Sequence, residues 1–261
     1  MRQRSLAALL AALSVALVCA RGQVANAAPP LTPGTSFTVQ FPDMPATLFA
    51  MWNKRTDPAQ MTVFLPRNYD PQRKHPLLIF LNGWDGGNAS NPTIARALSE
   101  EQDFVCVALP LFKARLDASV TPDTRRILIQ DDDGRYAWPH YRVMLQKLDE
   151  LVPNLDPAHR ILGGSSNGAH TVAGLINESD GEVARLFSAY FLVDGGGGLR
   201  RFDLLKDKPL LMVCGVWRPN PEAALAAGVK LTIHRMQEAK HAFPETEYPP
   251  IREWLRGPGM Q

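Results

Sequence analysis

The 261-residue sequence has few cysteines, little imbalance of charge and, after its N-terminus, no long hydrophobic run. Three cysteines without a C-x-x-C pair argue against a metal or redox centre and leave at most one disulfide, between Cys106 and Cys214, as the alternative to free thiols. A bilayer span needs about 20 apolar residues, and no segment after residue 27 supplies them. Cys106 and Cys214 lie in strand-like apolar runs, so we expect two buried free thiols.

The N-terminus has the pattern of a signal peptide. Two arginines precede a run of mostly Ala, Leu and Val over residues 5–18, and residues 25–27 read Ala-Asn-Ala, an A-x-A cleavage site. We predict a signal peptide over residues 1–27 and a secreted or periplasmic mature protein, with a retained anchor as the alternative. Cleavage would remove three basic residues and leave 25 basic and 26 acidic ones, a balance that indicates neither nucleic acid nor an anionic membrane as a partner.

Apolar runs and helical patterns alternate through the rest of the chain. We expect a Pro-rich leader over 28–35 and one domain over 36–261. The strand candidates are Ser36–Phe41, Met61–Leu65, Leu77–Leu81, 104–109, Arg160–Gly163, Ala189–Val193, Pro209–Cys214 and Lys230–Arg235. The helix candidates are Thr93–Glu101, Tyr141–Leu151, Ala169–Ile176, Pro221–Ala227 and Ile251–Leu255. This alternation predicts an α/β fold, a mostly parallel eight-stranded sheet with helices on both faces.

The segment between the fourth and fifth strand candidates has weak periodicity. It spans residues 110–138, and we expect it to edge the active-site cleft. It contains Asp131–Asp133 followed by Gly134, which we predict to be a solvated turn because the rest of a calcium-loop pattern is missing. In the helix that follows, Val143 is assigned to the apolar face.

The most informative motif is Gly164-Ser165-Ser166-Asn167-Gly168, a match to G-x-S-x-G. Ser166 is its centre, because a motif centred on Ser165 would need a glycine where Asn167 stands. An apolar strand candidate precedes the motif and a helix candidate follows it. That context is typical of a sharp strand-to-helix turn that exposes a nucleophilic hydroxyl, so Ser166 is the predicted nucleophile.

Acyl transfer also needs a base and donors for an oxyanion. His241 lies after the last strand candidate and before the last helix. Of the other five histidines, three precede or occupy strands, His170 lies on the helix after Ser166, and His140 lies in the variable region, where it could line the cleft. His241 is therefore the predicted base. The Gly-rich segment 80–87 follows the third strand, and we expect the backbone N–H groups of Trp84 and Asn167 to form the oxyanion hole.

Asn-Gly-Trp-Asp-Gly-Gly, Gly-Ser-Ser-Asn-Gly-Ala-His and Lys-His-Ala-Phe-Pro, in this order over residues 60–256, resemble the α/β-hydrolase superfamily. The Ser-Asn-Gly-Ala elbow is similar to that of secreted esterases of the polyhydroxybutyrate-depolymerase and feruloyl-esterase type. The resemblance implies an α/β-hydrolase fold and cleavage of a small-molecule or polymer ester through an acyl-enzyme on Ser166. It implies no cofactor and no metal.

The sequence departs from this family at the acid that orients the histidine. The family carries a Gly-x-x-Asp pattern after the seventh strand, and here Arg218 stands in the aspartate's place, with donors only. Three alternatives follow: Asp194 after the sixth strand supplies the acid, Glu222 supplies it, or the chain has none. Without an acid, the chain would be a feeble enzyme or a binding protein with this fold.

Two neighbouring residues are candidates for substrate contacts. The Arg218 guanidinium could hold a substrate carboxylate, or it could form a structural ion pair with Asp194 or Glu222. Trp217 could form an aromatic wall with Trp84, or it could belong to the core. A peptidase with the same machinery is the less favoured interpretation, because the sequence shows no separate lid or propeller domain.

Overall fold

The structure is a computed structural model that describes residues 29–45, 58–83, 91–112, 133–217, 221–238 and 240–260. The chain divides into two units, residues 1–30 and 31–261, and the fold described below is that of the second. The predicted signal peptide, Trp84 and Arg218 lie outside the described residues. Within the described part of the chain, no helix is long and apolar enough to cross a bilayer.

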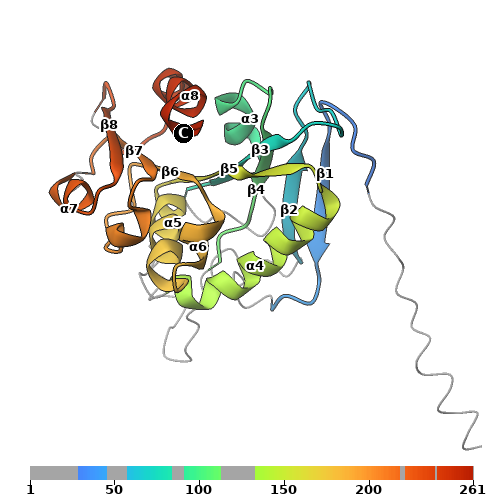
Figure 1. Cartoon of the computed structure of the whole chain (residues 1–261), viewed down its shortest axis with the longest axis horizontal. Helices are drawn as coiled ribbons and strands as arrows, with labels where there is room; N and C mark the ends of the chain where they lie inside the picture. The colour runs from blue at the N-terminus through green and yellow to red at the C-terminus, as the bar shows by residue number, and fades with distance from the viewer. Residues whose placement is uncertain are drawn as a thin grey trace, which may run out of the picture. The chain divides into compact units, whose positions relative to one another are not determined.

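An eight-stranded sheet forms the centre of the second unit, with the strand order β1-β2-β4-β3-β5-β6-β7-β8 (Figure 1). β1 pairs antiparallel with β2, β2 pairs antiparallel with β4, and the other neighbours are parallel. The strands are β1 Ser36–Phe41, β2 Ala59–Phe64, β3 His75–Leu81, β4 Val105–Ala108, β5 Leu155–Ser165, β6 Ala189–Val193, β7 Pro209–Cys214 and β8 Lys230–Arg235. The predicted mostly parallel sheet of eight strands is confirmed.

Helices cover both faces of this sheet, as predicted (Figure 1). The α-helices are α3 Thr93–Leu98, α4 Asp133–Leu151, α5 Asn167–Glu178, α6 Glu182–Leu186, α7 Pro221–Ala226 and α8 Tyr248–Arg256. Short 3₁₀ turns are η2 Phe202–Leu205, η3 Glu245–Glu247 and η4 Pro258–Met260. Residues of α3 and α8 share one buried cluster, and residues of α4, α5, α6 and α7 share the other.

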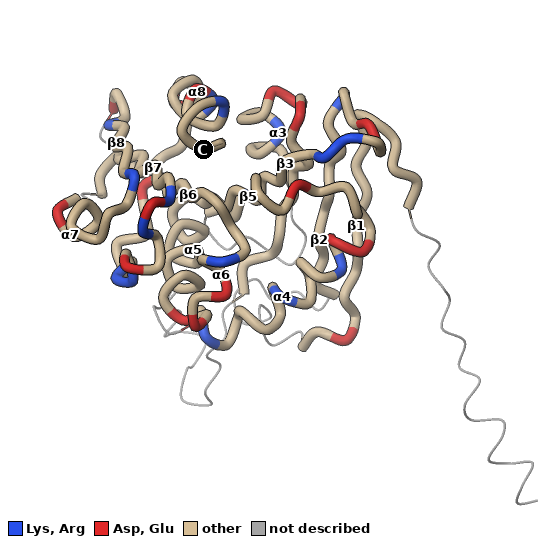
Figure 2. The backbone as a smooth tube through the Cα atoms, viewed as in Figure 1, with Lys and Arg blue, Asp and Glu red and all other residues tan. Residues whose placement is uncertain are grey.

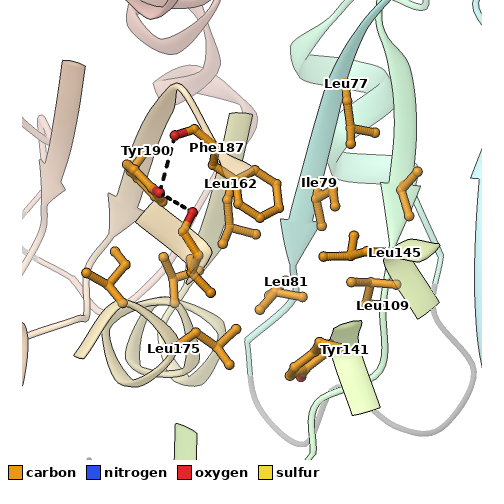
Figure 3. Packing of buried hydrophobic residues seen from close by; sticks show 14 of the residues in the cluster. Leu77, Ile79, Leu81, Leu109, Tyr141, Leu145, Leu162, Leu175, Phe187 and Tyr190 are labelled. Carbon is orange, nitrogen blue, oxygen red and sulfur yellow. Dashed lines mark hydrogen bonds between the residues drawn. The ribbon is translucent and has the colours of Figure 1, made fainter. Parts of the chain in front are cut away.

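The continuous apolar runs arise because the central strands are buried on both faces. In β3, Leu78 and Phe80 join the cluster of α3 and α8, whereas Leu77, Ile79 and Leu81 join the cluster of α4 and α5 (Figure 3). Successive side chains of Leu77–Leu81 therefore point into two different cores, so each of these positions is apolar.

The cysteines, the charged residues and the leader can be compared with their predictions. Cys106 and Cys214 are free and buried, as predicted, and burial raises the pKa of the Cys106 thiol to about 12. That thiol therefore stays protonated and unreactive at neutral pH. Acidic and basic residues are interspersed along the described backbone (Figure 2). Part of the predicted leader is bound to the domain, because the Gly34 N–H donates to the Leu65 carbonyl at 3.1 Å.

The predicted solvated turn before α4 is wrong for the residues that the structure describes. Asp133 is 1% exposed and opens α4, while Asp131 and Asp132 lie outside the described residues. Gly134 packs directly on α5: a Cβ at this position would lie 2.2 Å from the Gly174 carbonyl oxygen. The acidic sequence indicated solvent, but this close approach of two backbones carries the helix start into the interior.

The assignment of Val143 to the apolar face of α4 is also wrong. Val143 is 48% exposed, and the buried stripe of the helix runs through Tyr141, Met144 and Leu148. These three recur at the i, i+3, i+7 spacing of one helical face, and Val143 lies to one side of it. The helix α6 was not predicted, because its five residues are too few to show a helical period.

We predict that Gly134→Ala lowers the free energy of unfolding by about 1–3 kcal/mol, since the added methyl group meets backbone atoms that cannot move aside like a side chain. Val143→Ala, on the exposed side of the same helix, should stay within about 0.5 kcal/mol of the parent. Urea unfolding followed by circular dichroism measures both. Equal stability of the two variants would contradict the close α4–α5 contact.

Candidate active site

Ser166 lies on the sharp turn that its motif predicted. It is the single residue between the end of β5 and the start of α5, with φ 50° and ψ −119°, a backbone conformation that is strained for any residue with a side chain. The glycines of the motif allow this turn. A Cβ at Gly164 would lie 2.5 Å from the Gly168 carbonyl carbon, and a Cβ at Gly168 would lie 2.0 Å from the Leu81 carbonyl oxygen.

The register of three neighbouring strands brings their ends to one place. Ser165, the last residue of β5, lies beside Val193 of β6, which lies beside Val213 of β7. The ladder continues one step further, because the Ser166 N–H donates to the Val193 carbonyl at 2.9 Å and the Asp194 N–H donates to the Val213 carbonyl at 2.8 Å. Ser166 and Asp194 therefore leave the sheet at the same edge, one strand apart.

A chain of hydrogen bonds connects Ser166, His241 and Asp194. The Ser166 Oγ lies 2.8 Å from the His241 Nε2, and the His241 Nδ1 lies 2.6 Å from the Asp194 Oδ2. An ionised carboxylate only accepts hydrogen bonds, so it requires the proton of a neutral imidazole to be on Nδ1. The lone pair of Nε2 then faces the serine hydroxyl.

Asp194 is the buried end of this chain, with its side chain 3% exposed, whereas the His241 side chain is 56% exposed. The second carboxylate oxygen, Oδ1, accepts the backbone N–H groups of Gly215 at 3.0 Å and Trp217 at 2.8 Å. Both oxygens of the buried group are thus matched by donors, as a buried charge requires.

Gly215 is a functional position whose importance the sequence did not reveal. A Cβ there would lie 2.3 Å from the Lys240 carbonyl oxygen and 3.2 Å from the Asp194 Cγ. The missing side chain therefore allows the segment that carries His241 to approach the end of β7. The available signal was a glycine directly after a buried strand, which often marks a close backbone approach.

The structure separates the two carboxylates that the sequence offered as the acid. Asp194 makes the bond to His241, while Glu222 is an exposed residue in the first turn of α7. Arg218, which occupies the position usual for the acid, lies outside the described residues. Asp194 already supplies the carboxylate that bonds to the His241 Nδ1. An acid at position 218 is therefore not needed for this bond.

The loop after β3 passes against the serine. A Cβ at Gly83 would lie 3.1 Å from the Ser166 Cβ and 3.2 Å from the Ser165 carbonyl oxygen. Asn167 is the first residue of α5 and directly follows Ser166. Two backbone segments, the loop after β3 and the start of α5, therefore meet at Ser166. Trp84, the other predicted donor, follows Gly83 but lies outside the described residues.

A pocket of about 360 Å³ is lined in part by Trp217, whose backbone N–H bonds to Asp194. The described residues that line it are Gly196, Gly197, Leu199, Arg200, Phe202, Met212, Trp217 and Ala223. Trp217 lines this pocket and packs against the hydrophobic core, while the predicted aromatic wall with Trp84 involves a residue outside the described part of the chain. Among the residues that the structure describes, no group of three His, Cys, Asp or Glu side chains is placed to hold a metal ion.

The strand order, with a serine on the turn after β5 and a histidine after β8, defines the α/β-hydrolase fold. No family model and no curated protein sequence matches the chain. Solved structures do match. A thermostable esterase has a TM-score of 0.56 and 18% identity, over 85% of this chain and 62% of that one.

Two further structures have comparable similarity. An esterase of Rhizomucor miehei has a TM-score of 0.54 and 13% identity, over 87% of this chain and 85% of that one. The acylaminoacyl peptidase of Pyrococcus horikoshii has a TM-score of 0.56 and 14% identity, over 78% of this chain and 40% of that one. The chain thus spans less than two thirds of the thermostable esterase and of the peptidase. At these identities the likeness establishes the fold.

Proposed function

We propose that the protein is a serine hydrolase that cleaves a carboxylic ester through an acyl-enzyme on Ser166. The observation that carries the proposal is the continuous path from the Ser166 Oγ to the His241 Nε2, 2.8 Å, and from the His241 Nδ1 to the buried Asp194, 2.6 Å. Nucleophile, base and orienting acid have this relation in serine hydrolases of several unrelated folds. The esterases that share the fold support the same class of reaction.

In the proposed reaction, the Ser166 oxygen attacks the ester carbonyl carbon while its proton passes to the His241 Nε2. The backbone N–H groups of Asn167 and Trp84 stabilise the tetrahedral oxyanion. The imidazolium then protonates the leaving alcohol, and the C–O bond to that alcohol breaks. Water, deprotonated by His241, attacks the acyl-enzyme and releases the carboxylic acid and the free serine. Asp194 holds the imidazole ring and stabilises its positive charge.

The proposed enzyme and a non-catalytic binding protein differ in whether His241 has an acid partner. That alternative arose from Arg218, which stands where related enzymes carry aspartate. A carboxylate at the end of β6 performs the same task, because His241 needs an acceptor at Nδ1 and the strand that supplies it is immaterial. A peptidase remains the second candidate, supported by the fold of the acylaminoacyl peptidase, and parallel assays on esters and acylaminoacyl amides distinguish the two.

We also propose that the protein is exported and processed after residue 27. The basic start, the apolar run and the Ala-Asn-Ala sequence at 25–27 support this proposal.

We predict that a fluorophosphonate probe labels the protein at Ser166, because the activated hydroxyl displaces fluoride from phosphorus. Ser166→Ala should abolish labelling, while the neighbouring Ser165→Ala should retain it. Intact-protein mass spectrometry and peptide mapping measure the adduct. A folded parent protein that stays unlabelled would refute the proposed activity and favour the binding protein.

We predict that Asp194→Asn lowers kcat for an activated ester by about 10⁴, because the amide no longer imposes the tautomer with a proton on Nδ1. The matched control is Glu222→Gln, which removes the other carboxylate that the sequence offered and should leave kcat unchanged. Steady-state kinetics on a p-nitrophenyl ester measures both. Loss of activity in the Glu222 variant, with Asp194→Asn fully active, would reverse the assignment.

We predict that the chain, expressed with its own N-terminus in a bacterial host, is recovered outside the cytoplasm beginning at Ala28. Ala27→Gln should block cleavage, because the A-x-A site requires small side chains. N-terminal peptide mass spectrometry reads the result. A cytoplasmic chain that still contains residues 1–27 would contradict export.

A further inference from the structure

The histidine of the proposed active site lies on a segment that leaves the sheet. β8 ends at Arg235, and the next regular element is η3, so His241 lies between the two. Its side chain is 56% exposed and receives little support from packing. A competent site therefore needs contacts that hold this segment in place.

The two ends of the segment meet at one buried carboxylate. Glu247 is 3% exposed, and its Oε1 accepts the backbone N–H of Gln237 at 3.0 Å. Its Oε2 lies 2.7 Å from the Nε2 of His234 in β8. One side chain at the end of η3 thus bonds to β8 and to the second residue after β8. Gln237 and Glu247 are ten positions apart in the chain.

Two further contacts fix the middle of the segment, but neither ties its ends together. The Lys240 carbonyl packs against Gly215, and the Phe243 ring stacks with Phe80 at 6.0 Å and contacts Tyr248 at 5.0 Å. These contacts set where His241 lies relative to β7 and β3. At the ends of the segment, Met236 and Tyr248 share one buried cluster, and the Glu247 carboxylate bonds to His234 and Gln237.

Glu247 is not explained by the helix that follows it. It precedes Tyr248 at the N-cap position of α8, yet its side chain makes no capping hydrogen bond there. Burial of an ionised carboxylate is costly unless its oxygens have donors, and here the donors come from Gln237 and His234. The stabilisation is therefore directed at the segment that carries His241.

We propose that Glu247, bonded to His234 and to the Gln237 N–H, is a positioning residue that holds His241 in register with Ser166. The proposal rests on the proposed function of Ser166 and His241. Glu247 touches neither of these residues; it acts through the segment that it closes. We call the bonds of Glu247 to His234 and Gln237 the clamp. Loss of the clamp lowers the fraction of molecules in which His241 is in place, so it lowers kcat more than it changes KM.

The test compares Glu247→Ala with Glu247→Gln and with Glu245→Ala, which removes an exposed glutamate two residues away in the same turn. Glu247→Ala should lower kcat by about tenfold, the factor that corresponds to about 1.4 kcal/mol of lost restraint, with KM within about threefold of the parent. The glutamine keeps an acceptor for Gln237 and can pair with the other tautomer of His234, so it should restore most of kcat. Glu245→Ala should match the parent.

Two additional measurements test the role of Glu247: the kcat of His234→Ala and the NMR signal of His241. His234→Ala removes one of the two bonds to Glu247. The His234 side chain is 26% exposed, so its loss leaves the core intact. This variant should reproduce the fall in kcat. In the NMR spectrum, the Nδ1–H resonance of His241 should be present in the parent and broadened in Glu247→Ala. Parental kcat and an unchanged resonance in both variants would overturn the clamp. If the parent protein shows no ester activity but the His241 Nδ1–H resonance is broadened in Glu247→Ala, the proposed function fails while the role of Glu247 in placing His241 stands.

Discussion

The carboxylate of Asp194 is the group on which the arrangement of the site depends. It lies at the tip of β6 and is almost fully buried, so its negative charge must be matched by donors. Those donors come from the segments that follow the next two strands of the sheet: the backbone of Gly215 and Trp217 after β7, and His241 after β8. One buried charge therefore draws three chain segments together, and it leaves the remaining imidazole nitrogen directed at the serine.

Close approach of backbones is the second constraint, and it explains the glycines of the site. Gly164 and Gly168 let β5, α5 and the end of β3 meet around the elbow. Gly215 lets the segment that carries His241 rest on β7. In each case a methyl group would collide with backbone atoms, which cannot rotate away. The site is thus assembled from main-chain contacts first, and the side chains that react are placed by them.

Much of the architecture could be predicted because strands buried on both faces leave long apolar runs in the sequence. All eight strands were found, and five of the six described helices were recognised at least in part. The short helix α6 was missed, and the other errors fell on α4, where Asp133 and Gly134 were predicted to form a solvated turn and Val143 to lie in the core. Packing of α4 on α5 decides which of its sides is buried, and the sequence of α4 contains no record of its neighbour.

What the sequence determined by itself is the local chemistry: a serine framed by glycines between a strand and a helix, and a histidine after the last strand. Each of these two signals is contained in a few neighbouring residues, so the local sequence is enough to show it, although Ser166 and His241 themselves are 75 positions apart. The acid was undetermined, because Asp194 and His241 are separated by 47 residues. Only the strand order and its register, which place the end of β6 between those of β5 and β7, decided which carboxylate reaches the imidazole.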